Sequence, residues 1–426
     1  MCILSIAMEI NRRLRKTFLF HLRPRNVSAS AAGFTYTWGL GGAAALLVLL
    51  SMASGVMLKF AYTPMPERAY GSIVGLQTSM AFGPLIRNVH HWSANILVLT
   101  VFLHMLRVFY TGAYQPPRGS NWWIGLVIFA AILASNFTGY LLPWDQLAYW
   151  AVTICTSMVA YLPVIGDDLR QMMVGGSELG PRTLANFYAL HTAVLPAVLI
   201  AALPFHFWRI RKAGGLAAKP GKLTNPEVKE VRLETIPHLL VRELAMAASV
   251  IALVMIMAAL WDAPLGPKAN PGLSPNPTKA PWYFAGLQEM LVHLHPLLAV
   301  AVIPLLVIIA LALLPIISKE NDSSGIWFGS PAGRRTSLIA ALTALIATPV
   351  WIIGYANGVS FLWWLAPVLG LALLPAIYGL SKKMPGASAH DGVQAMFTFL
   401  FTVFILLTIT GTWFRGTSMA LTWPWQ

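Results

Sequence analysis

The sequence predicts an all-α, polytopic membrane protein with about nine transmembrane helices, the first four of which form a bundle. Three observations predict this class. Of the 426 residues, 57% are hydrophobic and 10% are charged, whereas a water-soluble domain carries about 25% charged residues. Nine apolar stretches are long enough to cross a hydrocarbon core of about 30 Å as helices. The basic residues gather in alternate loops, as expected when a chain crosses a membrane repeatedly.

The nine stretches run in order from residue 34 to residue 414. They are 34–58, 87–109, 121–141, 186–208, 239–261, 297–317, 336–356, 360–380 and 393–414. With the N-terminus inside, 21 of the 29 lysines and arginines lie on the inner side and 8 on the outer side. This positive-inside pattern predicts a cytoplasmic N-terminus and an outer C-terminus in a bacterial inner membrane. The net charge of +14 follows this topology, so no nucleic-acid partner is expected.

Composition divides the chain into five parts. Residues 1–33 form a basic amphipathic tail on the inner face. Residues 34–212 form the four-helix bundle, and residues 213–236 form a basic inner linker. Residues 237–356 form a C-terminal region with a long outer loop, and residues 357–426 add two helices and an outer tail.

Two long loops are predicted on the outer side. The first, 143–182, opens with the sequence Pro143-Trp144-Asp145-Gln146. The second, 262–296, is rich in proline and glycine and contains Ala280-Pro281-Trp282-Tyr283. Tryptophan and tyrosine favour the membrane interface, so both loops are expected to carry interfacial helices.

Four histidines inside apolar stretches indicate the chemistry. His90 and His104 are 14 residues apart, and His191 and His206 are 15 residues apart. On a helix these steps span about 21–23 Å with an offset of about 40–60°, so each pair lies on nearly one face, near opposite membrane surfaces. The alternative is a hydrogen-bonding role between helices, but ionisable groups inside membrane spans are costly and usually functional.

Two facing helices of this kind offer two imidazoles at each level. Zinc prefers four protein ligands and non-haem iron sites usually add carboxylates, whereas haem needs only two axial ligands. We therefore predict two non-covalent b haems, an outer one held by His90 and His191 and an inner one held by His104 and His206. His91 competes with His90, but its 13-residue step to His104 turns it about 220° away.

Glycines repeat at the same step as the histidines. Gly41 and Gly55 in the first span, and Gly125 and Gly139 in the third, are each 14 residues apart. Glycine lets a flat macrocycle approach the backbone, although small residues also serve ordinary helix packing. Three arginines near the ends of the second span are candidates for haem propionates or for interfacial anchors; they are Arg87, Arg107 and Arg118.

These motifs resemble cytochrome b of the quinol-oxidising cytochrome bc and b6f complexes. The resemblance rests on Arg87-Asn-Val-His-His-Trp, on Thr138-Gly-Tyr-Leu-Leu-Pro-Trp-Asp-Gln and on Phe187-Tyr-Ala-Leu-His. The 15-residue histidine step is similar to the b6 type. Coverage is strong over 34–212 and looser over 236–356, which resembles subunit IV fused to a b6 part.

The resemblance implies a function. Quinol is oxidised at an outer site, one electron passes to a Rieske iron–sulfur protein and on to a c-type cytochrome, and the other crosses the membrane to reduce quinone at an inner site. Proton release outside makes the cycle proton-translocating, and the family's complexes are homodimeric. At the inner rim, Arg209, Arg211 and Lys212 could hold a quinone head or a propionate, or simply anchor the helix end.

The sequence departs from the family at the outer site. Where the family commonly has Pro-Glu-Trp-Tyr, this chain has Ala280-Pro281-Trp282-Tyr283, and proline cannot accept a proton. Trp282 and Tyr283 remain candidates to bound the quinol pocket. The candidates for the proton role are Glu289, Asp262, a water chain, and His293 or His295 at the proton exit.

A second departure concerns an additional haem. The b6 type often bonds a further haem to a cysteine in the first span, but Gly39 occupies that position here, so this covalent haem is expected to be absent. Two other functions remain open: a dihaem membrane anchor of a dehydrogenase or hydrogenase without a Rieske partner, and a transporter. A transporter would need broken helices and midplane charges, whereas the charges here cluster at span ends.

Overall fold

The computed structural model describes residues 26–424 except residue 31 and the segments 218–230, 319–323 and 360–361. Most of the predicted tail at 1–33 and much of the predicted linker at 213–236 therefore lie outside the described residues. The predicted all-α membrane class is confirmed: eight helices in the described part are long and apolar enough to span a membrane. They are α4 (Leu40–Lys59), α6 (Gly83–Tyr110), α7 (Gly119–Leu141), α10–η1–α11 (Pro181–Lys212), η3–α12 (Thr235–Leu260), η4–α14 (Leu297–Ile317), α15 (Pro331–Ala356) and α17 (Ala389–Trp413).

A further long helix, α16 (Leu362–Lys383), occupies the predicted stretch 360–380. The first span begins six residues later than the predicted start at residue 34. The short helix α3 (Phe34–Thr37) ends where Trp38 and Gly39 take left-handed backbone angles, with φ of 52° and 63°. These angles break the helical hydrogen-bond ladder, so α4 starts at Leu40.

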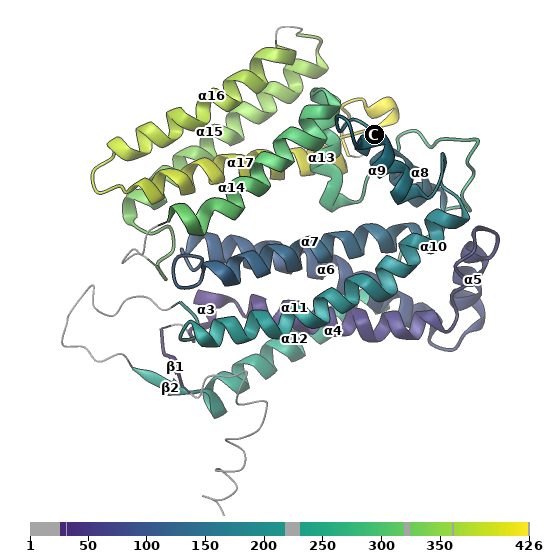
Figure 1. The fold of residues 1–426 in the computed structure, drawn as a ribbon, viewed down its shortest axis with the longest axis horizontal. Coiled ribbons are helices and arrows are strands. Elements are labelled where there is room, and N and C mark those ends of the chain that lie inside the picture. Colours follow the sequence, from purple (N-terminus) through teal and green to yellow (C-terminus); the bar gives the residue numbers. More distant parts are fainter. Residues whose placement is uncertain (1–25, 31, 218–230, 319–323, 360–361, 425–426) are drawn as a thin grey trace, which may run out of the picture.

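The helices form two groups (Figure 1). In the first group, α4 packs against α6, α7 packs against α11 (Leu195–Lys212), and α12 (Leu240–Leu260) covers α6. In the second group, α17 packs against α15 and α16. The shorter helices α5 (Pro66–Ser79), α8 (Gln146–Val159), α9 (Gly166–Val174) and α13 (Trp282–His293) gather at one end with the C-terminus. By the predicted topology this is the outer end, and both long outer loops do contain helices.

A strand pair lies at the opposite end of the molecule. Strand β1 (Asn26–Ser28) runs antiparallel to β2 (Arg232–Glu234), with Asn26 opposite Glu234 and Ser28 opposite Arg232. No strand was predicted here, because three-residue strands carry little pattern and this pairing joins segments about two hundred residues apart. The pairing attaches the start of the bundle to the segment that enters α12.

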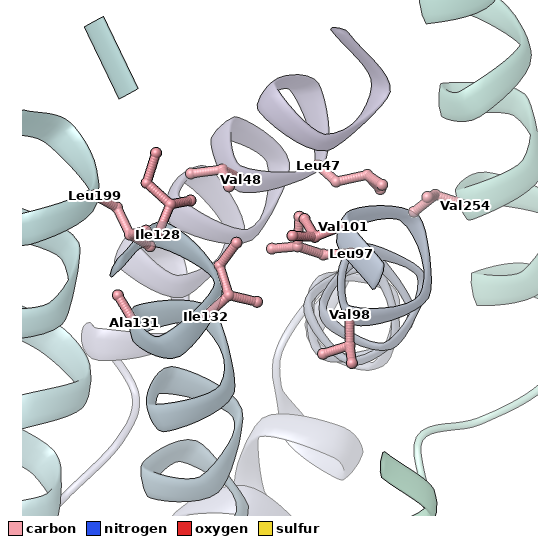
Figure 2. Packing of buried hydrophobic residues seen from close by; sticks show 10 residues of the cluster. All are labelled: Leu47, Val48, Leu97, Val98, Val101, Ile128, Ala131, Ile132, Leu199 and Val254. Carbon is pink, nitrogen blue, oxygen red and sulfur yellow. The ribbon is translucent and has the colours of Figure 1, made fainter. Parts of the chain in front are cut away.

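An apolar layer fills the middle of the first helix group (Figure 2). Each of the four bundle helices contributes one residue of this layer that lies halfway, or within one residue of halfway, between the two glycines or the two histidines of that helix. These residues are Val48, Leu97, Ile132 and Leu199, and all are at least 95% buried. This layer separates the two histidine levels with tightly packed aliphatic side chains.

Candidate functional site

The outer histidine pair is brought together by α6 and η1 (Leu190–Val194). The rings of His90 and His191 lie with centroids 6.0 Å apart and planes at 82°. Nδ1 of His90 is 3.0 Å from the carbonyl oxygen of Ser51, and Nδ1 of His191 is 2.8 Å from that of Ser135. Because a carbonyl only accepts, each Nδ1 carries the proton and each Nε2 keeps a free lone pair, the state in which imidazole binds a metal.

The inner pair consists of His104 on α6 and His206 on α11. Nδ1 of His206 is buried and has no well-aligned hydrogen-bond partner among the described residues, although the backbone of Asn121 lies nearby. His91, the rival of His90, instead contacts Trp92 and Asn95 on its own helix.

Each predicted glycine faces one of these histidines. A Cβ on the glycine would lie close to Cε1 of the imidazole: 3.3 Å for Gly41 and His104, 3.1 Å for Gly55 and His90, 3.6 Å for Gly125 and His206, and 2.5 Å for Gly139 and His191. Contacts under about 3 Å require something to move. The absence of a side chain at these positions therefore leaves room for the imidazole rings. The clearance for a haem macrocycle that the 14-residue step predicts stays a prediction.

A π-helical turn explains the unequal histidine steps. Residues Leu190–Val194 form this turn, and His191 lies within it. Such a turn adds about one residue to the α-helical ladder and often marks functional sites. With this one extra residue, two histidines 15 residues apart on this helix lie at the same two levels as two histidines 14 residues apart on α6. Helical geometry applied to the sequence alone missed this feature, since an α-helical period was assumed throughout.

The arrangement suits a group that needs two axial ligands. No group of three or more His, Cys, Asp or Glu side chains arranged to hold a metal ion occurs within the described residues. Two nitrogen donors per level, with glycines opposite, fit haem better than zinc or non-haem iron.

Two of the predicted arginines lie at the inner end. The guanidinium of Arg107 stacks 4.5 Å from the ring centre of Tyr36, and Arg118 donates from Nη2 to the carbonyl of Ala213 at 3.2 Å. Nη2 of Arg107 and Nε of Arg118 are buried without hydrogen-bond partners among the described residues. Burial raises the pKa of Tyr36, although the positive charge of Arg107 lowers it. The two buried N–H groups of Arg107 and Arg118 are suited to bind an anion at this end.

Arg87 and Arg211 differ from these two arginines. Arg87 donates from Nη1 to the carbonyl of Ala263 at 2.6 Å and from Nη2 to that of Pro264 at 2.7 Å. It therefore ties the second outer loop to α6. Arg211 lies half-buried in the last turn of α11, close to Arg209.

An outer cavity of about 230 Å³ lies between the two long outer loops. It is mostly apolar, and its walls come from α7, α8, α9, the segment before α13, α13 itself and η4 (Leu297–Val302). The lining residues are Phe137, Ala151, Ile154, Cys155, Met158, Val159, Met173, Thr278, Ala280, Phe284, Leu287, Gln288, Leu291 and Val300. Burial raises the pKa of the Cys155 thiol to about 11, so this side chain is neutral at physiological pH.

None of the four predicted outer-site residues is among those that line this cavity; they are Pro281, Trp282, Tyr283 and Glu289. Pro281 is the N-cap residue of α13, and Trp282 donates from Nε1 to Oδ1 of Asn95 at 2.8 Å. Burial, with the nearby Tyr140 and Cys155, raises the pKa of Tyr283 well above its usual range. The Glu289 side chain instead pairs with Arg415, which lies just after the end of α17 (Ala389–Trp413). Glu289 therefore has another partner in the fold and is not among the lining residues.

Several contributing residues were missed by the sequence reasoning. Gln288 accepts from the backbone N–H of Ala280 at 2.7 Å and donates to the carbonyl of Thr278 at 2.7 Å, so it shapes the entrance to α13. Asp145 caps α8 by accepting from Ala148 N and also accepts from Gly266 N in the second loop. The 3–4-residue spacing of Phe284, Gln288 and Leu291 was a signal that these side chains share one helix face.

A larger cavity of about 490 Å³ lies toward the inner end between α7 and α11. Most of its wall is apolar, and Arg209 contributes the cationic part. The guanidinium of Arg209 donates to the hydroxyl of Ser120 across the two helices. This contact gives Arg209 a role in joining α7 to α11.

Known proteins are similar in sequence to the bundle and similar in fold to nearly the whole chain. The family model described as cytochrome b/b6/petB matches residues 26–214. Cytochrome b6 of Heliobacterium modesticaldum is 45% identical over 175 residues, which are 41% of this chain and 82% of that protein. Cytochrome b6 of Prochlorococcus marinus (strain AS9601) is 44% identical over 175 residues, 41% of this chain and 80% of that protein.

One solved structure extends the likeness to the C-terminal half. A chain of a structure titled "Hyperthermophilic respiratory Complex III" superposes with a TM-score of 0.67 at 20% identity, covering 95% of this chain and 96% of that chain. At this identity the match shows the fold, which includes the helices beyond residue 214. Together with the 45% identity over most of a cytochrome b6, it shows that this chain is an integral membrane protein of the cytochrome b/b6 family.

Proposed function

We propose that this protein is the cytochrome b subunit of a quinol:cytochrome c oxidoreductase of the bc type. In this proposal electrons move between an outer quinol-oxidation site and an inner quinone-reduction site, and the cycle translocates protons. Membership of the cytochrome b family implies haem b. Bound at the two histidine levels, two b haems would supply a path for single electrons across the membrane.

The observation that carries the proposal is the pair of matched histidine levels. His90 and His191 would hold the outer haem, and their Nδ1–H···O=C hydrogen bonds orient both rings and keep Nε2 available. His104 and His206 would hold the inner haem. At the same end, Arg107 and Arg118 have N–H donors without a hydrogen-bond partner in the part of the chain that the structure describes. These donors are suited to propionates, and Arg211 borders this end.

The outer cavity supports quinol as the substrate. Its mostly apolar wall suits a quinone ring and tail, and pockets of a few hundred Å³ are usual for small organic ligands. Phe284 and Leu287 of α13 would contact the ring, while Trp282 and Tyr283 hold the start of α13 against the bundle. We extend the proposal to a Rieske iron–sulfur partner at this outer end, a c-type cytochrome as acceptor, and a homodimeric complex.

The dihaem-anchor alternative is less well supported. An anchor that passes electrons in one direction does not require a second long outer loop. Here Arg87 and Asp145 bind the second outer loop at Ala263 and Gly266, and residues of both loops line the outer cavity. The fold match to a chain of a respiratory complex III over 95% of this chain also favours the bc type.

Haem spectroscopy tests the proposal. We expect the purified protein to contain two b haems per chain, and His104→Ala to remove the inner haem while the outer one remains. The measurement is a reduced-minus-oxidised spectrum with a haem assay per protein. His91→Ala is the matched control and should keep both haems. Two intact haems in His104→Ala would refute the assignment.

The proline at the outer site predicts a pH effect. We expect Pro281→Glu to assemble normally and to add a carboxylate at the start of α13. A carboxylate accepts a proton only when ionised, so the rate of quinol oxidation should rise with pH through its pKa, which is about 4.3 in water and higher when buried. Steady-state rates across pH would show this new inflection. An unchanged profile would count against proton transfer at this position.

A further inference from the structure

A buried ion pair joins α13 to the end of α17. Glu289 is completely buried and Arg415 is 4% exposed. Nε of Arg415 lies 2.9 Å from Oε2 of Glu289 and 3.2 Å from Oε1, and Nη2 also donates to Oε1. Nη1 donates to the carbonyl of Met419 at 2.8 Å, which also orients the guanidinium. His293 completes the cluster, with Nε2 2.9 Å from Oε1 of Glu289.

Both groups of the pair are expected to be charged. Burial alone would raise the pKa of Glu289, but hydrogen bonds from His293 and Arg415 outweigh it and lower that pKa. An unpaired charge here would be very costly, because removing one partner of a buried pair typically costs about 3–5 kcal/mol. Any movement of α13 that separated Glu289 from Arg415 would therefore be very costly.

The two helices also cross at very close range. A Cβ on Gly411 would lie 2.7 Å from the carbonyl oxygen of Ala285, and one on Gly286 would lie 2.6 Å from Oγ1 of Thr408. Nζ of Lys279 donates to the carbonyl of Thr412 at 3.3 Å. With glycine on each side and polar contacts beyond, the end of α17 leaves α13 little freedom to rotate or slide.

The opposite face of α13 lines the outer cavity through Phe284, Leu287 and Leu291. From Leu287 to Glu289 the helix turns by about 200°, so the ion pair and the cavity wall lie on opposite sides of one helix. A rotation or shift of α13 would change the cavity directly, whereas the two histidine levels lie on other helices.

We propose that Arg415 is a positioning residue for the outer quinol site, acting through Glu289 to set the rotation and depth of α13. This inference rests on the proposed function. It gives the segment that follows α17 a role in quinol oxidation, although Arg415 is not among the residues that line the cavity.

The test uses the full complex in its membrane and four variants: Arg415→Gln, Arg415→Lys, Glu289→Gln and the double variant Arg415→Gln with Glu289→Gln. We expect Arg415→Gln to lower kcat/KM for quinol by about 10²-fold, the loss that a misplacement of about 1 Å can cause, with both haem spectra unchanged. Arg415→Lys should keep most of the activity. The double variant should recover part of it, since no uncompensated carboxylate remains.

The matched control is Arg335→Gln, an exposed arginine on α15, which should keep wild-type kcat and KM. Wild-type kinetics in Arg415→Gln would overturn the inference. Equal loss of haem and activity in Arg415→Gln, with no recovery in the double variant, would also overturn it by showing a purely structural role. An inactive wild-type complex with intact haems would instead refute the proposed function.

Discussion

The glycine opposite each histidine limits the space around the imidazole ring at the two histidine levels. A Cβ at position 139 would approach Cε1 of His191 to 2.5 Å, whereas one at position 125 would lie 3.6 Å from Cε1 of His206, an ordinary contact. The same substitution therefore has different consequences at two positions that look equivalent in the sequence.

At this scale, Gly139→Ala should displace the His191 ring and reduce the outer haem content, with an overpacking cost of about 1–3 kcal/mol. Gly125→Ala is the matched control and should retain the inner haem. The haem content per chain and the redox potentials of the two haems measure the difference. Equal haem content in the two variants would contradict this steric argument.

Single residues also connect the two outer loops. Asp145 accepts from Ala148 N at 2.9 Å within its own helix and from Gly266 N at 3.1 Å in the other loop. Gln146 accepts from Asn270 N at 2.6 Å. The Pro-Trp-Asp-Gln motif thus serves as an attachment point for the second loop, a role that the sequence did not reveal.

At the scale of the helix and loop, we expect Asp145→Ala to loosen the start of α8 and the segment 263–273 together. Loss of an N-cap costs about 1 kcal/mol, and loss of the second hydrogen bond adds about 1 kcal/mol. Hydrogen exchange of 263–273 should accelerate by roughly tenfold or more. Asp168→Ala, at an exposed position in α9, should leave exchange in this segment unchanged; acceleration in both variants would point to a general loss of stability.

Most helices were predictable as elements because each one carries a long apolar stretch whose length a membrane imposes. The first span was predicted to begin at residue 34 but begins at Leu40, since the left-handed residues Trp38 and Gly39 interrupt it. The π-helical turn at His191 was not predicted either. Backbone irregularities of this size leave the hydropathy pattern unchanged.

Across the whole molecule, α17 links the two membrane faces. Near its N-terminus, Gln394 donates to the carbonyls of Phe109 and Tyr110 at the inner end of α6. Just after its C-terminal end, Arg415 pairs with Glu289 of α13. The helices after residue 357 are therefore part of the packed structure and not a loose addition to it.

The charge distribution predicts the topology of the whole chain. With nine crossings, a phosphatase reporter fused after Trp423 should be active on the outer side, and a fluorescent reporter fused after Leu216 should be active in the cytoplasm. A fusion after Met384 should also report the cytoplasm, because α16 then crosses the membrane. An outer location for the Met384 fusion would remove one crossing and refute the nine-helix topology.

The sequence alone determined the class of protein, the order of the helices and the two levels of histidines, because hydropathy and helical period are local properties of the chain. Only the tertiary structure decided that Glu289 pairs with Arg415, which is 126 residues away, and that Arg87 binds Ala263, which is 176 residues away. A periodic pattern identifies which residues share a face of a helix. It does not identify the surface that this face meets, since that depends on how all the helices pack at once.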